Sequence, residues 1–164
     1  MSAYLVLRFL HIGSAIAMVG GVFARQLARS VAQRSEEPRA IDLGFRVADP
    51  IEKYMVIPGS SLVILFGVGL GLVTGAPILG VLQGASRNWL LTANLLVVAI
   101  LVLVPTVLVP RGKVFRKHLD EAMRTGGMTP ELRASLNDPI VRWAHLFELI
   151  ATIAVLLLMV FKPF

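Results

Sequence analysis

The stretch WLLTANLLVVAILVLVPTVLV, residues 89–109, runs for 21 residues without a charged side chain. An α-helix rises about 1.5 Å per residue, so roughly 20 apolar residues are needed to cross the roughly 30 Å of hydrocarbon in a bilayer. Three other segments of the chain have the same length and character. We therefore expect four transmembrane helices, near residues 4–24, 54–73, 89–109 and 140–161.

The composition of the whole chain is that of a membrane protein. Of its 164 residues, 56% are hydrophobic and 16% are charged, whereas soluble domains average about 45–50% and about 25%. We expect an all-α polytopic bundle in which residues 1–164 form a single four-helix transmembrane domain. The chain has no cysteine, which excludes disulfides, thiolate metal sites and cysteine nucleophiles.

Positive charge is distributed unevenly among the three connecting segments. Residues 25–53 carry six Lys or Arg and residues 111–142 carry seven, but the middle connection carries only Arg87. The positive-inside rule predicts that the two basic loops are cytoplasmic and that both termini lie outside. We also expect a retained first helix instead of a cleaved signal peptide, because its cations follow the apolar run. The net charge of +6 then reflects topology and contact with anionic headgroups, not nucleic-acid binding.

Both basic loops contain helical patterns. KVFRKHLDEAMR (113–124) has amphipathic helical spacing. TPELRAS (129–135) offers Thr129 as an N-cap and Pro130 at the first helical position. We expect short amphipathic helices that lie along the inner headgroup layer.

The predicted second and fourth helices begin with similar sequences, DPIEKY (49–54) and DPIVRW (138–143). In both, the aspartate can cap backbone N–H groups and the proline suits the first helical turn. Two explanations remain open: a signal on which helices starting at the cytoplasmic side converge, or a duplicated two-helix hairpin.

Small residues at four-residue spacing predict that the first two helices are neighbours, because such residues let helix backbones approach closely in lipid. They are Gly13, Ala17 and Gly21 on the first helix, and Gly67, Gly71 and Gly75 on the second. Pro58 and Pro105 are expected to bend the second and third helices.

Polar residues inside the spans are the candidate functional residues. Near the outer side, Arg8 is placed to snorkel to the headgroups, whereas His11 lies about 10 Å deep. Asn94 lies about 8 Å deep from the same side and is the predicted neighbour and hydrogen-bond partner of His11.

On the fourth span, His145, Glu148 and Thr152 share one helix face and form a polar track from the cytoplasmic side. A carboxylate as deep as Glu148 is expected to be protonated or to have a cationic or hydrogen-bonding partner. The track is either a structural network or a pathway for protons or small solutes. His145 and His11 differ in depth by about 12 Å, so they are not expected to ligate one haem iron together.

Other metal or nucleotide chemistry has little support. The three histidines and six methionines do not cluster as zinc or copper ligands, and His118 falls in a basic loop. No phosphate-binding loop or serine–histidine signature is present, and GVGLG (67–71) is better explained by helix packing.

Several stretches resemble known families. LRFLHIGSAIAMVGGVFARQLAR (7–29) resembles the first helix of a broad group of small bacterial membrane proteins, which implies a location in a bacterial inner membrane. The group includes HemJ-type protoporphyrinogen oxidases, CopD-like copper-resistance proteins and a family of predicted integral membrane proteins of unknown function. VLLLMVFKPF (155–164) resembles the HemJ-type ending, and residues 57–72 and 88–91 fit the same helix order more loosely. The family of unknown function is the closer match.

The HemJ-type resemblance implies that His11 binds haem b. It does not carry porphyrinogen oxidation over, because residues 91–94 read LTAN where HemJ-type proteins have polar and basic residues. The enzymatic reaction therefore stays open. Three hypotheses follow: a protein that binds haem b or a porphyrin through His11, a non-catalytic subunit that assembles with itself or with a membrane partner, and a pathway along the fourth span.

Overall fold

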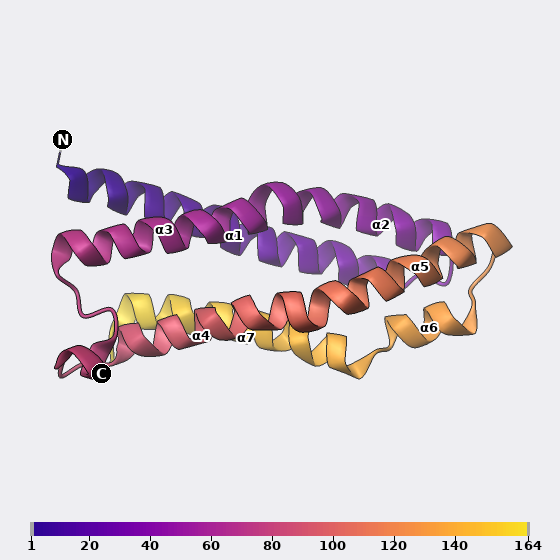
Figure 1. The fold of residues 1–164 in the computed structure, drawn as a ribbon. Helices are drawn as coiled ribbons and strands as arrows, with labels where there is room; N and C mark the ends of the chain where they lie inside the picture. The colour runs from indigo at the N-terminus through magenta and orange to yellow at the C-terminus, as the bar shows by residue number, and fades with distance from the viewer. Residues whose placement is uncertain (1, 164) are drawn as a thin grey trace.

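The computed structural model describes residues 2–163, so Met1 and Phe164 lie outside the described residues. Within this range the chain forms helices and connecting loops, without strands. Four long helical rods run lengthwise through the molecule, and residues 2 and 163 lie at the same end (Figure 1). The main elements are α1 (Ala3–Ala32), α2 (Pro38–Ile51), α3 (Ile57–Thr74), α4 (Trp89–Leu103), α5 (Val109–Thr125), α6 (Pro130–Leu136) and α7 (Pro139–Phe161).

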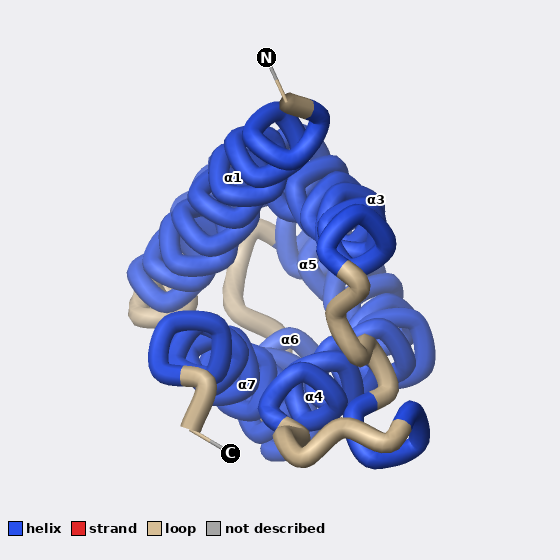
Figure 2. Tube along the Cα trace, turned by 90° about the vertical axis from the view of Figure 1, so that its left-hand side faces the viewer, coloured by secondary structure: helices blue, strands red, loops and turns tan. Residues whose placement is uncertain are grey.

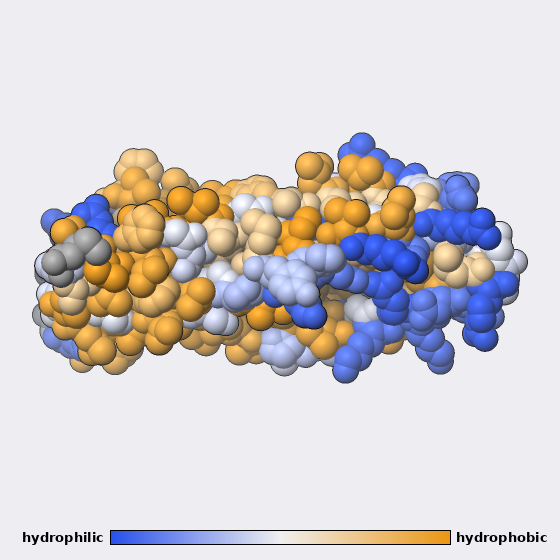
Figure 3. Space-filling view, turned by 90° about the horizontal axis from the view of Figure 1, so that it is seen from above, coloured by the Kyte–Doolittle hydropathy of each residue, from blue (hydrophilic) through white to orange (hydrophobic). Residues whose placement is uncertain are grey.

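The prediction of four transmembrane helices is confirmed. Four helical segments are long and apolar enough to cross a bilayer: Ala3–Ala32, Pro38–Thr74, Trp89–Thr125 and Pro130–Phe161. Figure 3 shows apolar residues over one part of the molecule and charged residues gathered at the opposite end. We call these the apolar end, which holds the chain termini, and the charged end, which holds α2, α5 and α6.

Two of the rods are longer than the predicted spans. A π-helical turn, η1 (Glu52–Val56), joins α2 to α3, and a second one, η3 (Val104–Leu108), joins α4 to α5. The amphipathic segment 113–124 was expected to lie along the headgroups, and this expectation is wrong. It belongs to α5, which continues the rod of α4 into the charged end (Figure 1).

The charged end has a hydrophobic core of its own. Phe115 of α5 stacks against Phe45 of α2 with ring centroids 4.5 Å apart. The predicted helix after Thr129 is confirmed as α6, and its N-cap hydroxyl accepts a hydrogen bond from the backbone N–H of Leu132. The buried residues of this core are Ala32, Ile41, Phe45, Leu119, Ala122 and Leu132. The basic loops are therefore a packed helical unit.

The repeated Asp-Pro-Ile sequence has different roles at its two positions. Asp138 caps α7, and its carboxylate accepts hydrogen bonds from the N–H groups of Ile140 and Val141. Asp49 and Pro50 instead lie inside the continuous rod of α2 and α3. Asp49 cannot act as a cap there, because the backbone N–H groups after it are bonded within the helix, and its carboxylate pairs with arginines instead. The prediction that a helix begins at residue 49 is therefore wrong.

In the apolar part, α1 packs along α3 and α4 packs along α7, while α1 and α7 touch over a shorter stretch (Figure 2). The prediction that the first two spans are neighbours is confirmed. A Cβ atom on Gly59 would lie 2.9 Å from the backbone nitrogen of Met18, and one on Gly21 would lie 2.9 Å from Met55 Cβ.

Not every predicted glycine contact forms. Gly13 has nothing within 4 Å of the position that a Cβ would take, and Gly71 is covered by Ile78 instead of by α1. Gly75 is the C-cap of α3, with φ of 66°. Pro105 lies inside the π turn η3, and Pro58 is the second residue after η1, so the irregularities expected at these prolines take the form of π turns.

We expect Gly59→Ala to lower the free energy of unfolding by about 1–3 kcal/mol, because the new methyl group meets the backbone of α1 and the helices must separate. Thermal unfolding in detergent, followed by circular dichroism, measures this change. Gly112→Ala in α5 is the matched control: nothing lies within 4 Å of its Cβ position, and alanine favours a helix by about 1 kcal/mol. Equal stability of the two variants would contradict the contact.

Candidate functional site

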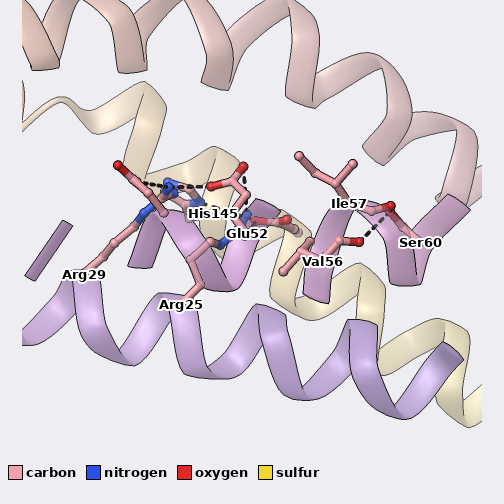
Figure 4. Close-up of polar contacts among 9 residues, drawn as sticks. Arg25, Arg29, Glu52, Val56, Ile57, Ser60 and His145 are labelled. Carbon is pink, nitrogen blue, oxygen red and sulfur yellow. Dashed lines mark hydrogen bonds and ion pairs between the residues drawn. The ribbon is translucent and has the colours of Figure 1, made fainter. Parts of the chain in front are cut away.

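A buried arginine links three helical elements where the apolar part meets the charged end. Arg25 of α1 is only 3% exposed. Its Nη2 atom donates to Oε2 of Glu148 on α7 over 2.6 Å, and its Nη1 atom lies 3.5 Å from Oε1 of Glu52 in η1. Figure 4 shows the side chain of Arg25 directed from α1 toward Glu52 and His145. Arg25 therefore holds α1 to both α7 and the π turn.

Arg29 repeats this arrangement one helical turn further along α1. Its Nη2 atom donates to Oε2 of Glu52 over 2.6 Å and lies 3.9 Å from Oδ1 of Asp49. Its guanidinium also stacks over the ring of Phe45, 5.6 Å from the centroid. We refer to Arg25, Arg29, Asp49, Glu52, Glu148 and His145 as the ion-pair network.

The network continues into the charged end through α5. Arg116 donates to Oδ2 of Asp49 over 2.6 Å and to Oδ1 of Asp42 over 3.1 Å. Arg111, near the start of α5, pairs with Asp138, the N-cap of α7. The rods therefore meet through opposite charges on the charged-end side of both π turns.

The charges at the centre of the network balance: Arg25 and Arg29 face Glu52 and Glu148. Removing such groups from water costs several kcal/mol per ion, and only close pairing and hydrogen bonding compensate this cost. Both arginines also have a buried Nε atom without a hydrogen-bond partner among residues 2–163. The network therefore specifies which helices meet, and it contributes less to net stability than the number of its ion pairs suggests.

The π turn η1 places Glu52 toward α1. A π turn adds a residue to the helical repeat and shifts the side chains that follow, and such turns are frequent at functional sites. Ser60 supports this region, because its hydroxyl donates to the carbonyl groups of Val56 and Ile57 over 2.8 and 3.0 Å (Figure 4).

The residues of the predicted polar track lie as follows. His145 Nδ1 is 3.4 Å from Oε2 of Glu148, while Thr152 donates to the backbone carbonyl of Glu148 over 2.7 Å. The hydroxyl of Thr152 is therefore bonded within its own helix turn. Glu148 has the cationic partner that its depth requires, and this partner is Arg25.

Sequence reasoning missed Arg25, Arg29, Asp49 and Glu52, because they read as charges of a loop beyond the membrane. A usable signal was present. Glu148 is predicted to lie about 12 Å inside the inner boundary, and Arg25 comes just after the first span. A long arginine side chain that reaches inward shortens the distance between these two residues. The pairing itself joins residues 123 positions apart, which no local pattern encodes.

His11 lies far from the network, against α3. Its Nδ1 atom is 3.0 Å from the carbonyl oxygen of Val63, and its Cε1 atom would lie 3.1 Å from a Cβ on Gly67. Gly67 therefore makes room for the ring. The carbonyl can only accept, so Nδ1 is the donor of this hydrogen bond, and in the neutral tautomer that donates from Nδ1 the lone pair is on Nε2. No hydrogen bond is formed by Nε2 within residues 2–163.

The hydrogen bond predicted between Asn94 and His11 is not formed. Asn94 instead donates to the carbonyl of Ile78, in the connection between α3 and α4, over 2.9 Å. His145 reaches Arg25 through Glu148, and Arg25 follows His11 by 14 residues of α1, or about 21 Å. This arrangement agrees with the expectation that His11 and His145 do not share one iron. Within the described residues, no three His, Asp or Glu side chains gather as a metal site.

Comparison with known proteins gives one match. A family model described as "Predicted integral membrane protein (DUF2269)" matches residues 5–163. No curated protein and no solved structure matches the chain. The resemblance to HemJ-type and CopD-like proteins is not shown by these comparisons.

We expect Glu148→Gln to lower the free energy of unfolding by about 3 kcal/mol, because it leaves the buried charge of Arg25 without its closest partner. Chemical or thermal unfolding in detergent measures the loss. Glu121→Gln is the control, since Glu121 forms an exposed pair with Arg124 on α5 and such pairs contribute about 0–1 kcal/mol.

The double variant Arg25→Met, Glu148→Leu separates the two effects of this pair. Because it removes both charges, it should be more stable than Glu148→Gln alone. A double variant that is less stable than the single one would contradict the view that an unpaired charge causes the loss.

Proposed function

We propose that this chain, which belongs to this family of integral membrane proteins, binds haem b or a porphyrin through His11. The observation that carries the proposal is the hydrogen bonding of the His11 imidazole. Nδ1 is oriented by the carbonyl of Val63, while Nε2 keeps an unused lone pair. Metal-ligating histidines almost always donate their other ring N–H to a carbonyl, a carboxylate or water, which fixes the tautomer.

The residues around His11 fit one axial ligand. The bare backbone at Gly67 lets the ring approach α3 closely, and the bond to Val63 limits its rotation. Neither Asn94 nor His145 forms a hydrogen bond with it, so we do not expect either of these two residues to share an iron with His11. When bound, haem supplies one-electron redox chemistry, which its axial ligand and surroundings tune. The role of this chain is to hold His11 in position within an apolar environment.

A second candidate is a non-catalytic membrane subunit, and the ion-pair network favours it. The central charges of the network face one another across α1, η1 and α7, so they hold helices together. A pathway along α7 has less support, because Thr152 is bonded to the carbonyl of Glu148 and does not extend the track.

We place the protein in a bacterial inner membrane, with the charged end in the cytoplasm and both termini outside. Three observations support this orientation. The charged end holds most of the Lys and Arg residues. Lys53 stacks over Tyr54, 5.2 Å from its centroid, at the level expected for the inner headgroups. At the apolar end, Lys162 stacks over Trp89 at 5.4 Å, as an aromatic belt at the outer interface would. Cations at the inner level would contact anionic lipids.

Because the chain has no native cysteine, its orientation can be tested with single cysteines. In spheroplasts, we expect a membrane-impermeant maleimide to label Ser86→Cys, in the exposed connection between α3 and α4, but not Gln33→Cys, at the end of α1. Permeabilisation should expose Gln33→Cys. The reverse labelling pattern would overturn the orientation.

The absorption spectrum of protein purified from haem-sufficient cells tests the cofactor. We expect a Soret band whose intensity falls at least tenfold in His11→Ala, because the axial ligand is lost. His118→Ala is the matched control: His118 lies at the charged end, where Nδ1 is 2.6 Å from Ser135 Oγ, and its removal should leave the band unchanged.

Gly67→Ala provides a graded variant at the same site. Its methyl group would lie 3.1 Å from His11 Cε1, so the ring must move and we expect a shifted or weakened band. A wild-type protein that shows no band even after haemin is added would refute haem binding. A band that persists in His11→Ala would place the ligand elsewhere.

A further inference from the structure

Arg8, near the start of α1, has no carboxylate partner among residues 2–163. Its guanidinium forms one hydrogen bond there, in which Nη1 donates to the hydroxyl oxygen of Tyr4 over 3.4 Å. The ten Asp and Glu residues all fall in segments 36–52 and 120–148, whereas Arg8 lies at the apolar end, close to the N-terminus (Figure 1). An arginine at the edge of the membrane with no acidic side chain near it is available to an anionic ligand.

The Nε2 atom of His11 is turned away from α3. Nδ1 is 3.0 Å from the carbonyl oxygen of Val63. Within 4 Å of the Cβ position of Gly67 lie two atoms of the ring, Cε1 at 3.1 Å and Nδ1 at 3.4 Å. Because the edge from Nδ1 to Cε1 faces α3 and Nε2 is more distant, a group bound to Nε2 would lie on the side of the ring away from Gly67.

Arg8 lies on this same side of α1. Leu7 and Met18 mark the side of α1 that contacts α3, since both approach Cβ positions of α3 glycines to within 4 Å. With about 100° between successive residues, His11 is about 20–40° around the helix from these two positions. Arg8 is about 60° beyond His11 in the same direction, and about 4.5 Å nearer the outer end of the helix. Its side chain therefore starts beside the face to which Nε2 is turned.

A haem or porphyrin carries anionic groups that suit this position. Its two propionate carboxylates are attached to one edge of the macrocycle, and a guanidinium binds a carboxylate through two parallel N–H···O hydrogen bonds. If that edge is turned to the outer interface, a carboxylate comes toward Arg8 and the apolar edge stays in hydrocarbon. The opposite direction would leave the carboxylates in hydrocarbon, which costs several kcal/mol. The next cation along α1 is Arg25, which already pairs with Glu148.

We propose that Arg8 binds a propionate carboxylate of the haem or porphyrin held by His11, and so fixes the direction in which the macrocycle lies. This inference rests on the proposed binding through His11. The sequence-based expectation that Arg8 reaches the headgroups involves the same chemistry, because a lipid phosphate also offers anionic oxygens to a guanidinium. The two partners differ in one testable respect: the propionate belongs to the cofactor, so Arg8 then contributes to the affinity for it.

Haemin and haemin dimethyl ester test this role, because esterification removes both propionate charges and keeps the iron. The Soret band, titrated in uncharged detergent, measures both affinities. We expect Arg8→Gln to weaken the binding of haemin by at least about five-fold and to leave the affinity for the ester unchanged. Arg8→Lys keeps the charge and should lose less. Arg34→Gln removes an exposed arginine at the charged end, so it controls for net charge and should change neither affinity.

Four results would contradict the role of Arg8. Equal losses with haemin and with the ester would show that the substitution acts on the fold. An unchanged affinity of Arg8→Gln for haemin would overturn the inference, and an Arg8-dependent rise in melting temperature in phosphatidylglycerol micelles would then identify a lipid phosphate as the partner. A wild-type protein that binds haemin and the ester equally tightly would refute the role of Arg8 and leave the ligand His11 in place. A wild-type protein that binds neither would refute haem binding itself.

Discussion

The ion pair between Arg25 and Glu148 is the constraint on which the arrangement of the helices depends. Both groups are almost completely buried, and neither has access to water that would replace its partner. In a low-dielectric setting an unpaired charge is far more costly than a paired one, so arrangements that separate α1 from α7 at this level are strongly disfavoured. The contact between α1 and α7 is short, and the ion pair gives it its register.

The rest of the fold adapts to this pair. The π turn η1 brings Glu52 to both arginines, and Asp49 is shared between Arg29 of α1 and Arg116 of α5. On one side of the network, helices are held by contacts at Gly21, Gly59 and Gly67, where lipid provides no hydrophobic drive for association. On the other side, a conventional apolar core holds α2, α5 and α6 together. The helix packing at glycines and the apolar core of the charged end thus meet at the ion-pair network.

The sequence predicts what depends on local composition. Span length and apolarity identify four membrane helices, and Thr129 with Pro130 identifies the start of α6, because these signals act within a few residues. Asp49 and Asp138 stand in nearly the same local sequence, yet only Asp138 caps a helix. Arginines from α1 and α5 take the carboxylate of Asp49, and this competition arises between distant segments. The partner of Glu148 escaped prediction for the same reason, since Arg25 reads locally as a topology signal.

The polar groups of the ion-pair network and the imidazole of His11 differ in how many of their atoms are held by other residues. In the network, Arg25 and Arg29 pair with Glu52 and Glu148, so a substrate or proton would have to compete with an ion pair in order to use these groups. His11 differs, because a single backbone carbonyl orients its ring and its other ring nitrogen has no hydrogen-bond partner among residues 2–163. About 21 Å of α1 lies between the two sites, so changes at one need not alter the other. The chemistry proposed for this chain therefore depends on one imidazole, which lies between α1 and α3, and the pair of Arg25 with Glu52 joins these same two helical rods further along.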